Sequence, residues 1–392
     1  MSPVSAFPAL LALLFAFTTA LLLTRKFGAP PDVGRYASID GLRGYLAFFV
    51  FLHHACIWYF YLQTGKWEVP PSNLYTNFGQ ASVALFFMIT GFLFFSKLIA
   101  GRTREIDWGR LFISRLMRLV PLYFFVMLLL FVTVVYVSHG VLNQPFTRLL
   151  QGVLQWLGFT IFGAPNLNGV SRTFTIVAGV TWTLSYEWAF YCALPLLALT
   201  LRVVPPWPYL VFGAVSMIAA AIWWHPQVYA LLAFAGGIGA AFLVRIEAFR
   251  VFSDSIVASF VVVGCLAGAV LAFPSSYSKA PLLLLTLAFV LMAAGSSVFG
   301  VLTHKVSRTL GEMAYSIYLL QGITLFIVFN FIVGLPESRA LSPMLFWLVI
   351  VAMTPALVLV CFVTFRWIEQ PGMRSTARVT GWLRARAQGA AL

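Results

Sequence analysis

The chain has 392 residues, of which 61% are hydrophobic and 16% aromatic but only 9% charged. Soluble domains carry about 25% charged residues, so this composition excludes an ordinary soluble domain and a disordered chain, and it indicates a protein embedded in a lipid bilayer. The formal net charge of +14 is typical either of a nucleic-acid-binding protein or of a membrane protein with basic inner loops, and the positions of the basic residues distinguish the two.

A helix that crosses a membrane needs about 20 mainly apolar residues, because each residue adds about 1.5 Å along the helix axis. By this criterion the sequence predicts an all-α integral membrane protein, a polytopic bundle of about eleven transmembrane helices. One further apolar stretch, 149–162, is too short to span and is expected to be interfacial or re-entrant. The predicted spans cover residues 6–24, 45–63, 80–99, 119–138, 180–201, 207–224, 227–244, 256–273, 281–300, 313–333 and 343–365.

The basic residues fall mainly on one side of these spans. Arg25 and Lys26 follow the first span and no basic residue precedes it, which predicts an outer N-terminus and is unlike a secretory signal. With alternating loops, 20 of the 25 basic residues are then inside, together with the C-terminus. Most of the net charge is therefore interpreted as topology, and nucleic-acid binding is not expected because the basic residues are spread over several loops. The five outer basic residues are Lys66, Arg148, Arg172, Lys279 and Arg339.

His54 lies in a predicted span, eleven residues after Arg43. This spacing returns to nearly the same helical face after three turns, about 16 Å along the axis. Arg43 could then bind an anion at the inner end while His54 accepts and returns a proton near the middle of the membrane. Alternatively, His54 is satisfied by a hydroxyl group of a neighbouring helix. His53, about 100° around the helix, is expected to be a packing neighbour.

Glu187 is the one carboxylate deep in a predicted span, and Thr183 and Tyr191 share its helix face. A carboxylate in this setting needs a partner. Glu187 could accept a proton, orient His54, or form a structural hydrogen bond between helices, and the sequence leaves these alternatives open.

The predicted inner loop 102–118 is rich in arginine, and Arg115 and Arg118 directly precede a span. They could anchor that helix at the inner surface, or they could clamp phosphate groups, to which arginine donates two parallel hydrogen bonds. The four cysteines all lie in predicted spans and form no CxxC pair, so neither a disulfide nor a metal site is expected.

Six sequence blocks together resemble the acyltransferase-three family of bacterial multi-pass membrane O-acyltransferases. In chain order they are SIDGLRGYLAFFVFLHH (38–54), GQASVALFFMITGFLFF (79–95), FISRLMRLVPLYFF (112–125), WTLSYEWAFYCALPLL (182–197), LGEMAYSIYLLQ (310–321) and WIEQP (367–371). The late block usually ends in His, and Gln321 stands there, which puts a proton role at that position in doubt. The resemblance divides the chain into an extra N-terminal span with its loop (1–35), an acyltransferase domain with a ten-helix core (36–371) and a short basic cytoplasmic tail (372–392).

The resemblance implies transfer of an acyl group, often acetyl, from cytoplasmic acyl-CoA to a sugar hydroxyl of a surface polysaccharide, lipopolysaccharide or related glycoconjugate. It also implies a site in the bacterial cytoplasmic membrane, without a metal. His54, Glu187 and Arg43 would act in catalysis, and Arg43, Arg115 and Arg118 would bind the CoA phosphates. Side chains of the matched blocks would contact the acceptor: those at positions 184 and 185, assigned to the Ser-Tyr pair of the fourth block, together with Trp182, Tyr191, Tyr315, Tyr318 and Glu369.

Two alternatives remain at this stage. Aromatic side chains of the predicted outer loops 64–78 and 163–179, Trp67 among them, could stack on sugars or simply mark the membrane interface. A transporter or flippase for a glycan or lipid-linked sugar would also have many spans and an intramembrane carboxylate. The sequence contains no pair of Gly/Pro-broken helices in matching halves, which favours the acyltransferase.

Overall fold

The computed structural model describes residues 1–31 and 36–389, with side chains of the last helix through residue 386, so the predicted inner-loop residue Arg35 lies outside it. This described part is helical apart from loops and one isolated bridge between Leu167 and Val170. It forms two compact units. The first unit comprises Met1–Phe95, Phe174–Val180 and Pro226–Cys361, and the second comprises Ser96–Thr173, Thr181–His225 and Phe362–Leu392.

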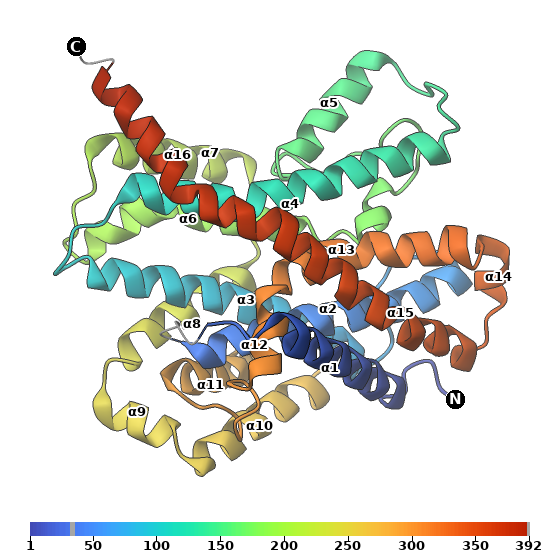
Figure 1. Ribbon diagram of the computed structural model, residues 1–392, viewed down its shortest axis with the longest axis horizontal. Coiled ribbons are helices and arrows are strands. Elements are labelled where there is room, and N and C mark those ends of the chain that lie inside the picture. Colours follow the sequence, from blue (N-terminus) through green and yellow to red (C-terminus); the bar gives the residue numbers. More distant parts are fainter. Residues whose placement is uncertain (32–35, 390–392) are drawn as a thin grey trace. The chain divides into compact units, whose positions relative to one another are not determined.

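The first unit is organised around α2, which packs on α12 and α13, while α11 packs on α8 and α10 and α1 packs on α12 (Figure 1). Its elements are α1 (Phe7–Phe27), α2 (Ala37–Thr64), α3 (Asn73–Ala100, of which residues to Phe95 belong here), α8 (Val228–Leu243), α9 (Glu247–Ser253), α10 (Ile256–Leu271), α11 (Lys279–Ala294), α12 (Lys305–Glu312), α13 (Ala314–Ile327), the π-helical turn η2 (Val328–Ile332), α14 (Leu335–Ala340), α15 (Pro343–Thr364, to Cys361) and most of the 3-10 turn η1 (Thr173–Val177).

Gly44 lies where α12 crosses α2. A Cβ atom on Gly44 would lie 2.6 Å from the Cβ of Leu310, closer than two side chains can approach. The glycine therefore permits the close contact that positions the helix carrying Arg43 and His54. Gly91 allows the same approach between α3 and α8, where a Cβ would lie 2.5 Å from the Phe234 carbonyl oxygen.

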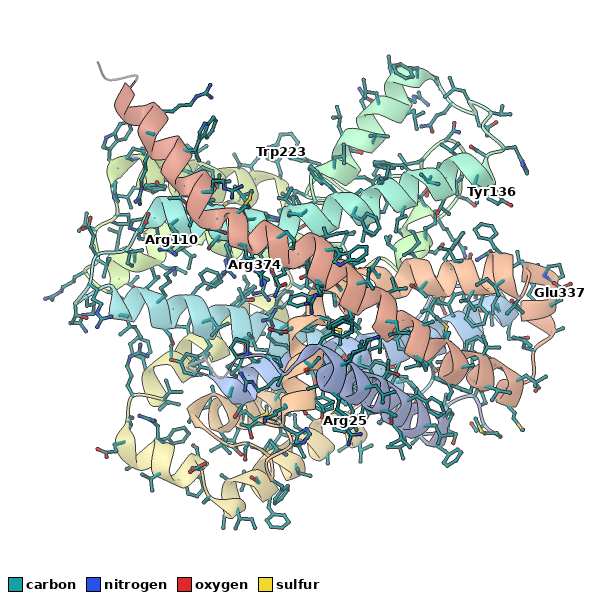
Figure 2. All side chains as sticks on the ribbon, in the orientation of Figure 1. Arg25, Arg110, Tyr136, Trp223, Glu337 and Arg374 are labelled. Carbon is teal, nitrogen blue, oxygen red and sulfur yellow. The ribbon has the colours of Figure 1, made fainter. Side chains whose placement is uncertain are left out.

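The second unit is organised around α4, which packs on α16 and on the π-helical turn η3, while α6 packs on α7 (Figure 1). Ser375 of α16 donates to the Met117 sulfur of α4 at 3.3 Å. In Figure 2, Arg110 marks the first turn of α4 and Tyr136 its last. The elements are α4 (Trp108–Val137), α5 (Phe146–Leu157), α6 (Trp182–Thr200), α7 (Trp207–Trp223), η3 (Phe365–Glu369) and α16 (Gln370–Gly389).

The helices confirm a polytopic membrane protein. Within the described residues, six helical segments are long and apolar enough to cross a membrane, and a seventh is reached if α8 and α9, bent by 109°, count as one span. Helices α7, α10 and α11 are apolar but shorter. Large apolar side chains are exposed along α4 and α7, as expected of surfaces that face lipid: Phe124, Leu128, Val132, Val215, Ile218 and Ile222. The count of eleven spans and their orientation stay predictions.

Several predicted boundaries are wrong. Helix α2 begins at Ala37 instead of residue 45, and α4 begins at Trp108 instead of residue 119. Arg115 and Arg118 therefore lie within α4 and not in a loop before it. Polar first turns were mistaken for loops because apolar length alone marked the spans, whereas long arginine side chains can extend from a helix toward the polar interface. The segment after the last predicted span continues through η3 into α16, and the stretch 149–162 forms the short helix α5.

Asp107 fixes the start of α4. Its carboxylate accepts the backbone N–H of Arg110 at 3.0 Å, as an N-cap residue does. It also accepts from the guanidinium of Arg384 on α16. Burial alone would raise the pKa of Asp107, but the backbone N–H of Arg110 and the charge of Arg384 lower it more. The ion pair itself contributes little, because the two side chains are 60% and 38% exposed.

Candidate active site

His54 is partly exposed on α2, and its ring is held by a side-chain amide. Its Nδ1 lies 3.0 Å from Nε2 of Gln321 on α13. Because an amide nitrogen donates hydrogen bonds, Nδ1 accepts and the ring proton is on Nε2. The ring also has a hydrogen bond with the backbone of Val50, one turn earlier on α2. A hydroxyl group of a neighbouring helix was one partner expected for His54 from the sequence. The structure places a side-chain amide there instead.

His53 has a structural environment that differs from that of its neighbour. It is buried, and its Nδ1 lies 2.7 Å from the carbonyl oxygen of Tyr75, to which it donates. The ring also fills the space beside Gly79, where a Cβ would lie 2.6 Å from the His53 Cγ. The prediction that His53 is a packing neighbour is confirmed.

Trp67, in the loop after α2, forms an aromatic wall beside His54. The two rings are nearly parallel, with centroids 6.4 Å apart. Trp58, Tyr61 and Phe174 meet the indole edge-to-face at 5.7, 5.4 and 6.3 Å. The indole is only half-buried, so part of this wall remains open next to the histidine.

The two tyrosines predicted on α13 are both buried in the first unit. The Tyr318 hydroxyl donates to the Val180 carbonyl at 3.2 Å and thereby ties α13 to the segment Phe174–Val180. Gly322 lies against the same segment, because a Cβ there would be 2.6 Å from the Ala178 nitrogen. These contacts hold the helix that carries Gln321. A direct contact of Tyr315 and Tyr318 with the sugar acceptor stays a prediction.

Arg43 lies on α2, partly exposed and six residues after the first residue of the helix. The uninterrupted helix confirms that Arg43 and His54 share one rigid element. Their axial separation is about 16 Å at the rise of an α-helix.

The second unit brings together Arg115 and Arg118 of α4 and Glu187 and Tyr191 of α6. The Tyr191 hydroxyl donates to the Glu187 carboxylate at 3.0 Å. Arg115 interacts electrostatically with Tyr191, Arg118 and Glu187. The cluster supplies the partner that Glu187 requires. Because His54 belongs to the first unit, the orientation of His54 by Glu187 stays a prediction.

The assignment of the Ser-Tyr pair of α6 to positions 184 and 185 is wrong by one residue. Position 184 is Leu184, and the pair is Ser185 and Tyr186. The Leu184 side chain is apolar and only 2% exposed, so it packs inside the second unit and cannot bond to a sugar hydroxyl. The predicted hydroxyl contacts of this block therefore pass to Ser185 and Tyr186.

These two residues, Trp182 and Glu369 also lie in the second unit. Ser185 donates to the Phe159 carbonyl at 3.4 Å, and Tyr186 packs edge-to-face against Trp182 at 5.5 Å. Trp182 is 37% exposed, whereas Glu369, at the end of η3, is 1% exposed. Of these four, the exposed Trp182 is best able to contact a ligand directly.

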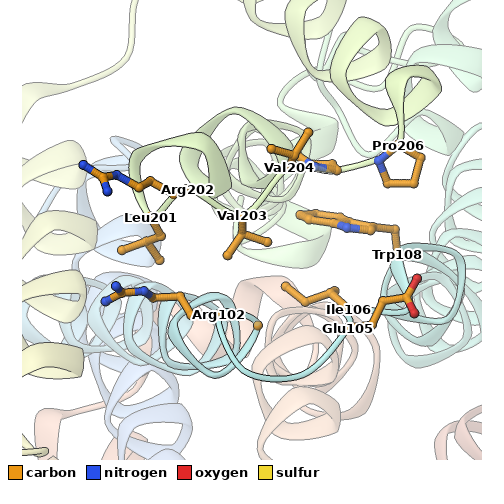
Figure 3. Close-up of a pocket in the computed structure, with 11 residues that line it drawn as sticks. Arg102, Glu105, Ile106, Trp108, Leu201, Arg202, Val203, Val204 and Pro206 are labelled. Atoms are coloured by element: carbon orange, nitrogen blue, oxygen red, sulfur yellow. The ribbon is translucent and has the colours of Figure 1, made fainter.

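A pocket of about 610 Å³ lies in the second unit, between the turn from α3 to α4 and the turn from α6 to α7 (Figure 3). Figure 3 shows Arg102 and Arg202 at one end and Trp108 at the other. Arg202 has a left-handed backbone conformation with φ of 58°. Sequence reasoning missed this pocket because its two arginines belong to turns far apart in the chain.

The comparison with protein families decides the class of this protein. The acyltransferase domain family matches residues 36–366. The chain belongs to the acyltransferase 3 family. The protein is therefore a multi-pass membrane acyltransferase, and family membership supports the enzyme over the transporter alternative. No curated protein and no solved structure matches it.

The matched range of the acyltransferase contains every predicted site residue except Glu369, which lies just beyond its end. Helices α1 and α16 also lie outside the match, and the predicted division at residues 35 and 371 remains a prediction. No group of three His, Cys, Asp or Glu side chains that could hold a metal ion occurs among the described residues. None of the four cysteines, all of which lie in the described residues, forms a disulfide bond.

Proposed function

We propose that this acyltransferase moves an acyl group, with acetyl the expected one, from cytoplasmic acyl-CoA to a sugar hydroxyl of a surface polysaccharide, lipopolysaccharide or related glycoconjugate. Its setting would be the bacterial cytoplasmic membrane, with the N-terminus outside and the C-terminus inside. The observation that carries the proposal is His54, partly exposed on a helix of the membrane domain and hydrogen-bonded by Gln321, with Arg43 on the same helix.

In this proposal His54 acts as a general base. A ring nitrogen takes the proton of the acceptor hydroxyl while the hydroxyl oxygen bonds to the thioester carbonyl carbon. The carbon–sulfur bond then breaks, and the departing CoA thiolate takes the proton from His54. The aromatic wall of Trp67, Trp58 and Tyr61 would limit the access of water to the thioester. A histidine that briefly carries the acyl group is the alternative for this step.

The donor phosphates would bind to arginines. Arg43, Arg115 and Arg118 are the residues proposed for this role, with Glu187 assisting catalysis through its cluster with Tyr191. The pocket of the second unit adds Arg102 and Arg202, two guanidinium groups at one end of a cavity whose other lining residues are apolar except for Glu105 near Trp108. This combination suits an anionic ligand with an apolar part, such as the nucleotide end of acyl-CoA.

The test is transfer of labelled acetyl groups from acetyl-CoA to extracted surface glycans by the purified protein in lipid vesicles. His54→Ala should abolish transfer, while His139→Ala, a change at an exposed histidine, should leave it intact. Full activity of a folded His54→Ala protein would remove His54 from the mechanism. A protein that moves glycans across the vesicle without acetylating them would overturn the proposed function.

A further inference from the structure

Gln321 has an unusual hydrogen-bonding state. The side chain is fully buried, with an exposed fraction of 0%. Its Nε2 lies 3.0 Å from His54 Nδ1, but its Oε1 is buried and accepts no hydrogen bond from any described residue. Buried amide oxygens in proteins nearly always have a donor, so this orphan acceptor needs a physical explanation.

The arrangement determines which nitrogen of His54 is free. With the amide N–H donated to Nδ1, the ring proton is on Nε2, and the base lone pair is already used by Gln321. If the amide turns by about 180°, Oε1 lies at Nδ1 instead. The partly exposed ring gives its Nε2 proton to water and takes a proton from water at Nδ1, so that Oε1 accepts the Nδ1–H and the Nε2 lone pair is free to take a proton.

We propose that Gln321 is a positioning residue for acyl transfer, whose side-chain amide turns to select the tautomer of His54. In the arrangement described above, Gln321 donates to His54 and holds it with a proton on Nε2. In the reactive arrangement, Oε1 accepts from Nδ1, and Nε2 takes the proton of the acceptor hydroxyl. Oε1 stays bonded to the Nδ1–H while the ring is positively charged and until Nε2 passes its proton to the thiolate. The inference rests on the proposed function of His54.

The surroundings fix the two residues relative to each other. α13 is held by the bond from Tyr318 to Val180 and by the close approach of Gly322 to Ala178. α2 packs directly on α13. With both helices held, a turn of the amide changes the bond to His54 without moving the backbone.

Few groups near this pair carry charge. The titratable side chains of the two helices that carry the pair, and of the loop beside them, are Asp40, Arg43, Tyr45, His53, Cys56, Tyr59 and Tyr61 on α2, Tyr315 and Tyr318 on α13, and Glu68 next to Trp67. His53 donates to a carbonyl, and Glu68 is exposed. Because a glutamine does not titrate, Gln321 adds no group of its own to the acidic limb of the rate–pH profile, which His54 is expected to give.

The experiment compares the wild type with five variants of the reconstituted full chain, three at Gln321 together with Thr324→Val and His54→Ala, with acetyl-CoA as donor. Gln321→Leu removes both amide groups and should lower kcat by about 10- to 100-fold with little change in the KM for acetyl-CoA, the size of effect typical of residues that orient a functional histidine. Gln321→Glu places a carboxylate at Nδ1, so it should retain more activity than Gln321→Leu and move the acidic limb to higher pH. Gln321→His should broaden that limb, because two coupled groups then titrate.

The matched control is Thr324→Val, one turn further along α13. The Thr324 hydroxyl donates only to the Leu320 carbonyl of its own helix in the described structure, so kcat and the pH profile should not change. Thermal unfolding in detergent identifies a variant that fails to fold, and in that case the pH profile of Gln321→Glu decides.

The outcomes separate the two proposals. Active wild type, inactive His54→Ala and unchanged kcat in folded Gln321→Leu would overturn the role of Gln321 alone. A rate–pH profile of Gln321→Glu whose acidic limb lies at the same pH as in the wild type would also overturn the role of Gln321. Absence of acetyl transfer in the wild type, or full activity of His54→Ala, would instead overturn the proposed function.

Discussion

Tyr191→Phe tests whether the cluster on α6 is needed by the enzyme. The substitution removes only the hydroxyl that donates to the Glu187 carboxylate at 3.0 Å. A hydrogen bond to a charged group contributes about 1.5–3 kcal/mol when it is buried. Tyr191 is buried but Glu187 is partly exposed, so water can replace part of the lost bond. We therefore expect the lower end, about 1.5 kcal/mol of unfolding free energy. If the cluster also stabilises the transition state, kcat/KM should fall about tenfold.

A double-mutant cycle with Glu187→Leu, which removes the acceptor, measures this interaction directly. Unfolding in detergent and labelled acetyl transfer would be measured for the wild type, both single variants and the double variant. Because both changes remove the bond between Tyr191 and Glu187, Tyr191→Phe should cost less once Glu187 is replaced, and the remaining cost comes from the bond of the same hydroxyl with Arg115. Tyr136→Phe, at a 68% exposed tyrosine of α4, is the control that should change neither quantity. Fully additive effects of the two substitutions would refute the reasoning, because the bond would then contribute nothing of its own.

Three further predictions concern other parts of the molecule. Arg102→Ala and Arg202→Ala should each raise the KM for acetyl-CoA about threefold to tenfold, and more at low salt. Arg104→Ala, in the same turn as Arg102 but outside the pocket, should leave this KM unchanged. Equal effects of all three substitutions would exclude the pocket as the binding site of the donor. Trp67→Ala should raise the KM for the glycan about threefold to tenfold, and Trp67→Phe should raise it much less. The KM is measured by titrating the acceptor, and an unchanged KM in Trp67→Ala would exclude stacking of a sugar on Trp67. Asp107→Ala should cost about 1 kcal/mol at neutral pH. Because the pKa of Asp107 is lowered in the folded state, this contribution should be complete at neutral pH, begin to fall below about pH 4 and be lost as the pH falls through the lowered folded-state pKa. Thermal unfolding of both proteins across this range follows the loss, and a difference that does not shrink toward low pH would contradict the capping role.

Apolar runs predicted the helices better than their ends. Each predicted span contains or overlaps an apolar helix, because the requirement for internally bonded backbone in lipid leaves the chain few alternatives. Helix starts were missed where polar residues continue a helix beyond its apolar part. Asp107 could have revealed one such start, since an aspartate before a helical pattern is an N-cap signal.

The candidate site was predictable only along single helices. The eleven-residue spacing placed Arg43 and His54 on one face of α2, and the i, i+4 spacing related Glu187 to Tyr191. Contacts between distant segments could not be read from spacing. Gln321 lies 267 residues from His54 and bonds to it only because α13 packs on α2. The pocket arginines come together in the same way, from two turns that the sequence separates.

The adjacent histidines of α2 show why the partner matters more than the residue type. A main-chain carbonyl can only accept, so Tyr75 keeps the proton of His53 on Nδ1. A side-chain amide can donate or accept, so Gln321 can bond to His54 in either tautomer. His54 is also the less buried of the two and lies beside the half-buried Trp67. Exposure and an adaptable partner together make His54, and not His53, the histidine that can exchange a proton with a substrate.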